Sequence, residues 1–284
     1  MFTPFAFVQE AAGGGSPYGP LTTAFLTATG ISDATIETAL NDLETGLTTY
    51  SLGSKMVALY PMVGGTSDTT KYNFMNTSAF TIAWNGTITF ASTGAKKSAA
   101  NMQTAWGNTG VTPNANLTLN DTHLSFYSRT QLTGTGTDAL TGILYPSDIG
   151  CGINSGGRFE MEICSGPNNS MWSRQYAENE QVKTDNQTTT TGLFVSSRTS
   201  SSDLRTFRNA SQVGSTYTGA QSKNFSTSTG AIFVLAEANE SSGMNVGTLR
   251  ECAFASIGNG LSPTNSSDLY TIVQAFQTTL GRQV

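Results

Sequence analysis

Residues 231–280 decide the fold, and they read AIFVLAEANESSGMNVGTLRECAFASIGNGLSPTNSSDLYTIVQAFQTTL. An apolar run at 231–237 predicts a strand, and after a polar loop a second apolar run at 252–257 predicts another. A helix is predicted over 262–280, because Pro263 suits the first helical position and Gly281 follows the last turn. One face of this helix carries an apolar stripe of Leu269, Ile272, Val273, Phe276 and Leu280. Strands that end in one amphipathic helix indicate a β-domain with a helix packed on it.

The same β signal extends back to residue 56. Short apolar or alternating runs predict strands at 56–60, 80–84, 87–90, 124–128, 139–145, 159–163, 170–176, 193–198 and 204–209. Asn85-Gly86 lies between two of them and predicts a hairpin turn. No helices alternate with these strands, so a parallel α/β sheet is excluded. The sequence therefore predicts one all-β sandwich over residues 56–284, with its C-terminal helix at 262–280.

Two further segments precede the sandwich. Residues 1–20 predict an extended arm, because Phe2, Phe5 and Phe7 are too few to form a core and glycines and prolines follow them. We expect the arm to dock on another protein. Residues 21–55 predict a helical lead-in: Ser32 is a suitable N-cap, and apolar residues then recur at helical spacing. We expect this helix to pack at one end or edge of the sandwich.

Composition narrows the classes of function. Charged residues make up 12% of the 284 positions, about half the usual share. The formal net charge of −5 argues against nucleic-acid binding, which needs basic surface. No apolar run approaches the roughly 20 residues that span a bilayer. The N-terminus lacks the basic start of a secretory signal, so we expect the chain either to stay inside a cell or to leave without its own export signal, as in a virus particle freed by lysis. The three cysteines do not indicate a disulfide framework.

Catalytic chemistry has little support in the sequence. Glu160 and Glu162 alternate on one strand, and a glycan hydrolase would need two such carboxylates across the scissile bond. The same alternation fits a solvent-facing strand, which is the interpretation we favour. His123 is the single histidine, so a serine or cysteine nucleophile has no clear base and zinc has no ligand set. We predict no enzyme, no cofactor and no metal centre, although scattered loop oxygens that hold calcium would leave no trace in a sequence.

Aromatic and planar polar side chains offer a site for sugar. Period-two alternation places Trp172, Arg174 and Tyr176 on one face of their strand, and Tyr127 and Arg129 form a similar pair. These five residues are the candidate carbohydrate-binding residues. The alternative is that they are core or subunit-interface aromatics, because interfaces are also rich in Trp, Tyr and Arg.

Two motifs in the β region resemble concanavalin-A-like jelly rolls of the laminin-G-like kind. The first is the strand 192–198 followed by DLRTFRNAS at 203–211, in which Ala210 stands where that family has glycine. The second is FASIGNGLSPTNSSDLY at 254–270, with Asn265 at the family's usual acidic position. The resemblance covers residues 56–284 and implies a β-sandwich. It says little about function.

A narrower resemblance comes from four other stretches. SKMVALYPMVGGT at 54–66, HLSFYSRT at 123–130, GLFVSSRT at 192–199 and LYTIVQAFQTTLGR at 269–282 resemble structural proteins of tailed phages and other viruses. That likeness implies a non-enzymatic protein of the virion surface: a tail or head fibre, a tail tip or a capsid decoration. It implies other virion proteins as partners of the arm, and a homo-oligomer, a trimer if the protein is a fibre. The alternative is a carbohydrate-binding module or adhesin that recognises a host glycan.

Overall fold

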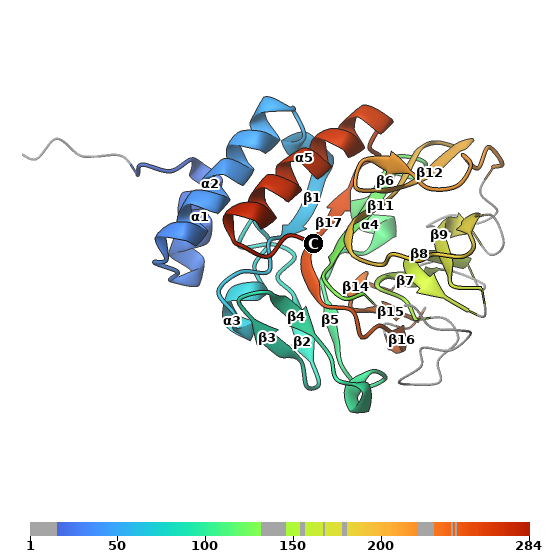
Figure 1. Cartoon of the computed structure of the whole chain (residues 1–284), viewed down its shortest axis with the longest axis horizontal. Coiled ribbons are helices and arrows are strands. Elements are labelled where there is room, and N and C mark those ends of the chain that lie inside the picture. The colour runs from blue at the N-terminus through green and yellow to red at the C-terminus, as the bar shows by residue number, and fades with distance from the viewer. Residues whose placement is uncertain are drawn as a thin grey trace, which may run out of the picture.

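A computed structural model describes residues 16–131, 146–153, 157–166, 168–177, 181–220, 230–239, 241 and 243–284. The chain forms three layers, in which helices cover one face of a first sheet and a second sheet packs on its other face (Figure 1). The predicted all-β sandwich with helices near both ends is therefore confirmed. The predicted arm residues Phe2, Phe5 and Phe7 and the predicted strand at 139–145 lie outside the described residues.

The first sheet, sheet A, is antiparallel and has the strand order β13-β12-β11-β6-β17-β4-β3, with β1 also paired to β17. Its strands are β1 (Met56–Tyr60), β3 (Thr89–Ala91), β4 (Gly94–Lys96), β6 (Thr122–Ser128), β11 (Gly192–Ser200), β12 (Asp203–Arg208), β13 (Ser211–Gln212) and β17 (Cys252–Gly258). The centre of this sheet is formed by β11, β6 and β17, so the two stretches that resemble laminin-G-like jelly rolls lie on either side of β6.

The second sheet, sheet B, has the order β10-β9-β8-β7-β14-β5-β2, and β15 and β16 extend it beside β7. Its strands are β2 (Ala83–Asn85), β5 (Trp106–Asn108), β7 (Ile149–Ile153), β8 (Gly157–Ser165), β9 (Ser170–Ala177), β10 (Gln181–Thr184), β14 (Phe233–Val234), β15 (Ala236–Ala238) and β16 (Met244–Gly247). The pairing of β15 with β7 is parallel, and the other described pairings are antiparallel.

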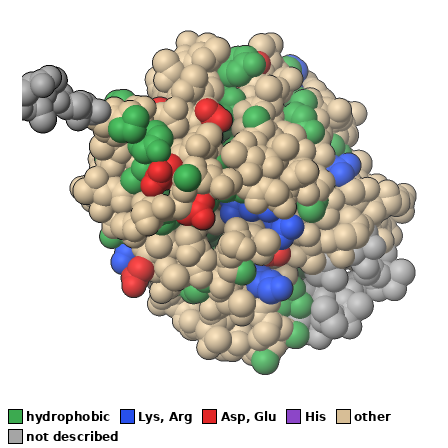
Figure 2. Space-filling model, turned by 60° about the vertical axis from the view of Figure 1, so that its left-hand side comes forward, with side chains coloured by type: hydrophobic (Ala, Val, Ile, Leu, Met, Phe, Trp, Pro, Cys, Tyr) green, Lys and Arg blue, Asp and Glu red, His purple; other side chains and the backbone are tan. Residues whose placement is uncertain are grey.

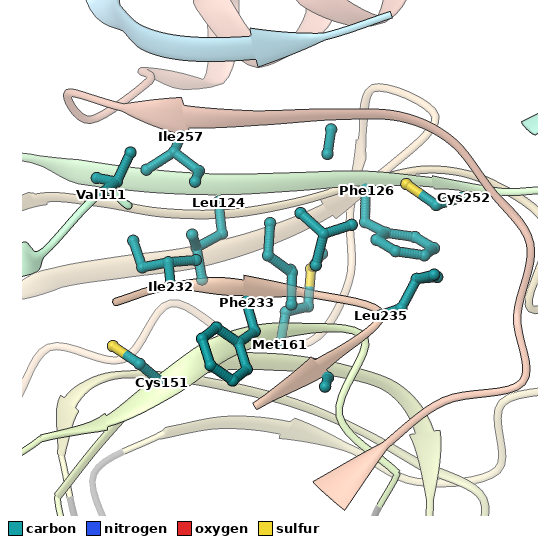
Figure 3. Packing of buried hydrophobic residues seen from close by; sticks show 14 of the residues in the cluster. Val111, Leu124, Phe126, Cys151, Met161, Ile232, Phe233, Leu235, Cys252 and Ile257 are labelled. Carbon is teal, nitrogen blue, oxygen red and sulfur yellow. The ribbon is translucent and has the colours of Figure 1, made fainter. Parts of the chain in front are cut away.

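Two hydrophobic clusters hold the layers together. Between the sheets, Leu124 and Phe126 of sheet A face Met161 and Phe233 of sheet B (Figure 3). On the other face of sheet A, a second cluster joins the sheet to the helices, and it includes Phe25, Leu43, Tyr127, Val195, Phe254, Leu269 and Phe276. Cys151, Cys164 and Cys252 are free thiols in the interior, as a chain without a disulfide framework requires.

The helices are α1 (Pro20–Thr29), α2 (Ala34–Thr49), α3 (Ser67–Thr70), α4 (Pro113–Asn116) and α5 (Pro263–Thr279), with 3-10 turns at Gly53–Lys55 and Ala99–Asn101. The predicted C-terminal helix is confirmed: Ser262 caps it, and Ser262 and Asn265 form a capping box. The lead-in contains two helices where one was predicted. Its second helix is capped by Asp33, whose side chain accepts from two backbone amides, and Ser32 lies outside it. Helix α2 packs beside α5, and α1 packs against α2, so the helices lie over a face of the sandwich, where we predicted an end or edge (Figure 1).

Two strand predictions were wrong. Asn85-Gly86 does turn the chain, but β2 pairs with β5 in sheet B and β3 pairs with β4 in sheet A, so the turn joins the two sheets and makes no hairpin. Gly86 is needed there, because its φ is +69° and a Cβ would lie 2.1 Å from the carbonyl oxygen of Thr104. The predicted strand at 231–237 breaks into β14 and β15, because Leu235 has a φ of +67°.

The departure from the family pattern at Ala210 leads to a stability prediction. Asn209 and Ala210 form the β12–β13 turn with φ values of +46° and +68°. A left-handed conformation costs a non-glycine residue roughly 1–2 kcal/mol. We expect Ala210→Gly to raise the free energy of unfolding by about 1 kcal/mol in urea titrations. Ala83→Gly, within β2, is the matched control and should lower it; equal effects of both changes would contradict this account.

Candidate functional site

The outer face of sheet B carries a row of polar side chains. Alternation along β8 turns Phe159, Met161 and Ile163 into the core, so Glu160 and Glu162 lie on the outer face. The register of β8 with β9 sets Glu160 opposite Arg174 and Glu162 opposite Trp172. On the next strand, β10, Gln181 lies opposite Arg174 and Lys183 opposite Trp172. The row therefore crosses three neighbouring strands.

Strand β7 makes room for this row because its outward positions are glycines. Gly150 lies between Glu160 of β8 and Glu237 of β15. A Cβ at residue 150 would lie 2.5 Å from the Cβ of Glu160. Since only glycine leaves that space, the Glu160 side chain can lie across β7 toward Glu237.

Three carboxyl groups then meet two guanidinium groups. Nη1 of Arg174 donates to both Glu160 and Glu162, and its second bond is 3.3 Å long. Nη1 of Arg158 donates to Glu237 at 2.7 Å and lies 3.4 Å from Glu160. Glu160, Glu162 and Glu237 are each no more than 1% exposed. We call these five residues the carboxylate–arginine cluster.

Further hydrogen bonds fix the geometry of the cluster. Ser165 Oγ donates to Glu162, Gln181 accepts from Nε of Arg174 at 2.9 Å, and Asn245 Nδ2 donates to Glu237 at 2.7 Å. Because every charged head in the cluster has a partner, the side chains are held in place before any ligand arrives.

Burial shifts the protonation of two of the carboxyl groups. Desolvation, followed by repulsion from Glu160, raises the pKa of Glu162 to about 8. The same two causes, in the same order, raise the pKa of Glu237 well above its usual value. At neutral pH, the proton on Glu162 leaves at most two carboxylate charges against the two guanidinium charges, and the raised pKa of Glu237 shifts this balance toward positive charge. The cluster therefore carries no net negative charge at neutral pH.

The shift at Glu162 predicts a pH dependence of stability. Between the ordinary value of 4.5 and about 8, the folded chain holds a proton that the unfolded chain has released. The stabilisation that this proton gives the folded chain is complete below pH 4.5. It falls by about 1.4 kcal/mol per pH unit above that value and is lost as pH rises through 8. We expect the free energy of unfolding of the wild type, measured in urea, to decline between pH 5 and 8 relative to that of Glu162→Gln. His123 and Lys97 also titrate with shifted pKa values, but both chains contain them, so their effects cancel in the difference. A flat difference would contradict the assignment.

A hollow of about 310 Å³ opens at one end of the cluster. Its described lining residues come from β7, β8, β15, β16 and the turn between the last two: Gly152, Gly157, Arg158, Glu237, Asn239, Ser241 and Asn245. These strands lie on the side of the molecule away from α1, α2 and α5 (Figure 1). The hollow thus offers one guanidinium, two amides and one hydroxyl, which are groups that bind sugar hydroxyls and small polar ligands, and the buried carboxyl of Glu237 holds the guanidinium in place.

The structure separates the predicted sugar residues of β9. Trp172 and Arg174 share the outer face, as predicted, and the Arg174 guanidinium lies 4.6 Å from the Trp172 ring centroid. Nζ of Lys183 lies over the same ring at 5.1 Å, so two cations already contact it. Tyr176 does not share this face, which corrects the prediction. The strand register shifts near its end, Tyr176 has a φ of +63°, and its fully buried ring stacks on Phe159 between the sheets.

The second predicted pair, Tyr127 and Arg129, lies elsewhere. Tyr127 is fully buried in the cluster under the helices, and its hydroxyl accepts from the Val284 amide. Nε of Arg129 donates to the Arg282 carbonyl oxygen at 2.8 Å, and Nη1 lies 3.5 Å from Glu251. Both residues tie sheet A to the C-terminus. Tyr127 thus takes the place of a core aromatic, which is the alternative given for these residues, and the pair lies apart from Trp172.

The hydrolase alternative also meets a geometric obstacle. Both carboxyl groups it would use, Glu160 and Glu162, are 0% exposed and share the Nη1 donor of Arg174. A glycosidic bond cannot lie between two groups that a guanidinium already occupies. The pair has the geometry of an ion-pair network.

Sequence reasoning missed Arg158, Glu237 and Asn245, which line the hollow. Arg158 and Glu237 are 79 positions apart, and only the sheet topology brings them together. A local signal did exist: Glu237 is an acid at the end of an apolar run, and Gly150 and Gly152 interrupt a strand. A strand glycine often marks a close approach of neighbouring chain.

Charged side chains are sparse on the face of the molecule that Figure 2 shows, where a few Lys, Arg, Asp and Glu groups lie among other side chains and backbone, as a charged fraction of 12% leads one to expect. Among the described residues, no helix is both long and apolar enough to cross a membrane. Within the same residues, no group of three His, Cys, Asp or Glu side chains is arranged to hold a metal ion.

Comparisons with known proteins bear on the fold alone. No family model and no curated protein matches the sequence. A solved receptor-binding domain is similar with a TM-score of 0.50 and 13% identity, over 79% of this chain and 52% of that one. Domain 4 of AbnA, an extracellular arabinanase from Geobacillus stearothermophilus solved with arabinotriose, is similar with a TM-score of 0.45 and 13% identity, over 76% of this chain and 98% of that one. The binding domain of Paraclostridial Mosquitocidal Protein 1 has a TM-score of 0.49 and 8% identity, over 77% of this chain and 52% of that one. The alignment thus spans about half of the receptor-binding domain, and that likeness supports the β-sandwich assignment.

Proposed function

We propose that this chain is a non-enzymatic, saccharide-binding β-sandwich, and that the hollow beside Arg158 and Glu237 receives one unit of a glycan. The observation that carries this proposal is the hollow itself: it is lined by guanidinium, amide, carboxyl and hydroxyl groups and rests on a cluster whose charged heads are all paired. Side chains fixed in advance lose little conformational entropy when a ligand binds. The similar receptor-binding domain adds an analogy at the level of the fold.

The wider setting we propose is the surface of a virion, where the chain would serve as a fibre, tail-tip or decoration subunit that contacts host glycans. This part rests on the viral resemblance of four sequence stretches and on the low charged fraction. Residues 1–15 would attach the subunit to other virion proteins, and we propose a homo-oligomer. The proposed glycan recognition uses side chains alone and needs no cofactor.

The attachment proposal has its own test. A deletion of residues 1–15 leaves the contacts of Tyr18 with Glu37 and of Gly19 with Asn41 in place, so the fold should persist. We expect this truncated chain to keep the melting temperature of the full chain and to fail to enter particles. Normal incorporation of the truncated chain would contradict the role of the arm, and light scattering of both chains would give the oligomer.

Glycan binding is tested by blocking the hollow. Ser241 is exposed, lines the hollow and makes no ion pair, so Ser241→Trp should fill the space and leave the cluster intact. Ser202→Trp, at an exposed turn of sheet A, is the matched control. On a mixed glycan array we expect the wild type and Ser202→Trp to bind at least one glycan, and Ser241→Trp to lose it.

Trp172→Ala separates the hollow from the site predicted on β9. We expect this variant to retain glycan binding, because Arg174 and Lys183 already contact its ring. Loss of binding in Trp172→Ala with retention in Ser241→Trp would move the site to β9. An array on which no glycan binds the wild type would overturn the proposed function.

A further inference from the structure

Within the described part of the chain, the guanidinium of Arg158 uses only one of its nitrogen atoms for hydrogen bonds. Its hydrogen bonds to Glu160 and Glu237 all leave from Nη1. Nε and Nη2 have no hydrogen-bond partner among the residues that the structure describes. The side chain is 33% exposed and lines the hollow. The Nε–Nη2 edge is the one that binds a carboxylate through two parallel hydrogen bonds.

The acidic groups near Arg158 are closed to a ligand. Glu237 is 1% exposed, and its Oε2 already accepts from both Arg158 and Asn245. Glu160 is 0% exposed and is bonded to Arg174. A ligand in the hollow therefore meets a cation before it meets an anion. The cluster carries no net negative charge at neutral pH, so it does not repel an anionic ligand from Arg158.

The described lining of the hollow contains no aromatic residue. A neutral sugar in such a place would have hydrogen bonds but no ring to stack on. An ionised group that pairs with Arg158 supplies the missing interaction, since hydrogen bonds between charged partners are about twice as strong as neutral ones.

From these three observations we infer that the hollow selects a sugar that carries a carboxylate, with the acid bound across Nε and Nη2 of Arg158 and the ring hydroxyls bound by Asn239, Ser241 and Asn245. This inference rests on the proposed function and names the ligand class for the same site. Gly152 and Gly157 leave open the side of the hollow on which the ring would lie.

Protonation of the cluster gives the preference a pH dependence. The charged and titratable groups packed around Arg158 are Glu160 and Glu162 on β8, Arg174 on β9, Cys151 on β7 and Glu237 on β15. As pH rises from 7 to 9, Glu162 loses the proton that it holds with a pKa of about 8, and the cluster gains one negative charge. We expect the affinity for an acidic sugar to fall several-fold over this range, and the affinity for a neutral sugar to stay level.

The test uses the full chain and four probes: lactose, a sialylated lactose, a sulfated lactose and an oligomer of galacturonic acid. Titration calorimetry at pH 7 should show at least one carboxylated probe binding tenfold or more tightly than lactose. Arg158→Lys keeps the charge but loses the planar edge, and Arg158→Gln loses both, so both variants should reduce that preference to below threefold. Arg205→Gln is the matched control, because Arg205 is 31% exposed and paired with Asp203 on sheet A, and it should bind like the wild type.

These measurements distinguish selectivity for acidic sugars from saccharide binding in general. Equal binding of lactose and the carboxylated probes, or binding of sulfated lactose alone, would overturn the acidic-sugar inference and leave saccharide binding in place. A carboxylate preference that survives in a folded Arg158→Lys variant would also overturn it. Absence of binding to all four probes and to the glycan array would overturn both proposals.

Discussion

Arg174→Met is expected to lower the free energy of unfolding by about 3–5 kcal/mol at pH 7, because it removes the shared partner of two buried carboxyl groups. Glu160 would keep only the longer contacts with Arg158, and Glu162 would keep only Ser165. Neither side chain has access to water, since both are 0% exposed. Urea unfolding at pH 7 measures the loss.

Lys183→Met is the matched control for this change. Lys183 contacts the same Trp172 ring, but its side chain is 35% exposed and its ion pair with Asp185 lies at the surface. Surface pairs contribute roughly 0–1 kcal/mol. Equal losses in Arg174→Met and Lys183→Met would mean that the carboxylate–arginine cluster does not depend on Arg174.

Arg282→Met is expected to cost a similar amount, about 3–5 kcal/mol, for a different reason. Arg282 is 1% exposed and donates to the carbonyl oxygens of Pro61, Met62, Ser92 and Ala253. These carbonyls lie in segments up to 221 positions away, so one side chain ties the C-terminal segment to the residues after β1, to the β3–β4 turn and to β17. Its removal leaves buried backbone acceptors without donors.

The control for Arg282→Met is Arg205→Met, which removes an arginine from a half-exposed pair with Asp203. We expect a change of at most about 1 kcal/mol there. Thermal unfolding of the two variants side by side is sufficient. Arg282→Met melting within a degree or two of Arg205→Met would show that the buried guanidinium does not hold the C-terminus.

The features that the sequence predicts well are those with local causes. Helix α5 begins where Ser262 and Pro263 predict, because capping box and apolar stripe lie within one segment. Strands β1, β6, β8, β11 and β17 follow from short apolar runs. By contrast, Asn85-Gly86 does form a turn, as its residue types predict, but the strands on either side of it pair in different sheets. Which strand pairs with β2 is decided by packing between distant segments, and no turn signal contains that information.

The candidate site shows the same limit. Trp172 and Arg174 could be placed on one face by alternation, and they do share it. Tyr176 breaks the rule because the register shift at the end of β9 turns it inward, and a single irregular residue reverses the face of a side chain. Local signals marked Glu237 and the glycines of β7, but the contact between Arg158 and Glu237 could not be predicted, because it depends on β15 lying beside β7.

Backbone strain supports the importance of this corner of the fold. Leu235 and Tyr176 both have positive φ values, and each lies two residues from a member of the carboxylate–arginine cluster. Such conformations cost roughly 1–3 kcal/mol each and collect at binding and catalytic sites. Both residues are fully buried, so the surrounding core holds them in place.

The central claim is that a saccharide binds in the hollow of sheet B, and the most direct test is a titration of isotope-labelled protein followed by amide NMR shifts. The ligand would be the best binder from the glycan array. We expect the largest changes in amide shift at Gly152, Gly157, Arg158, Ser241 and Asn245. These changes should vanish in Ser241→Trp. Shifts centred instead on Trp172 and Lys183, or on the helices α1, α2 and α5, would contradict it.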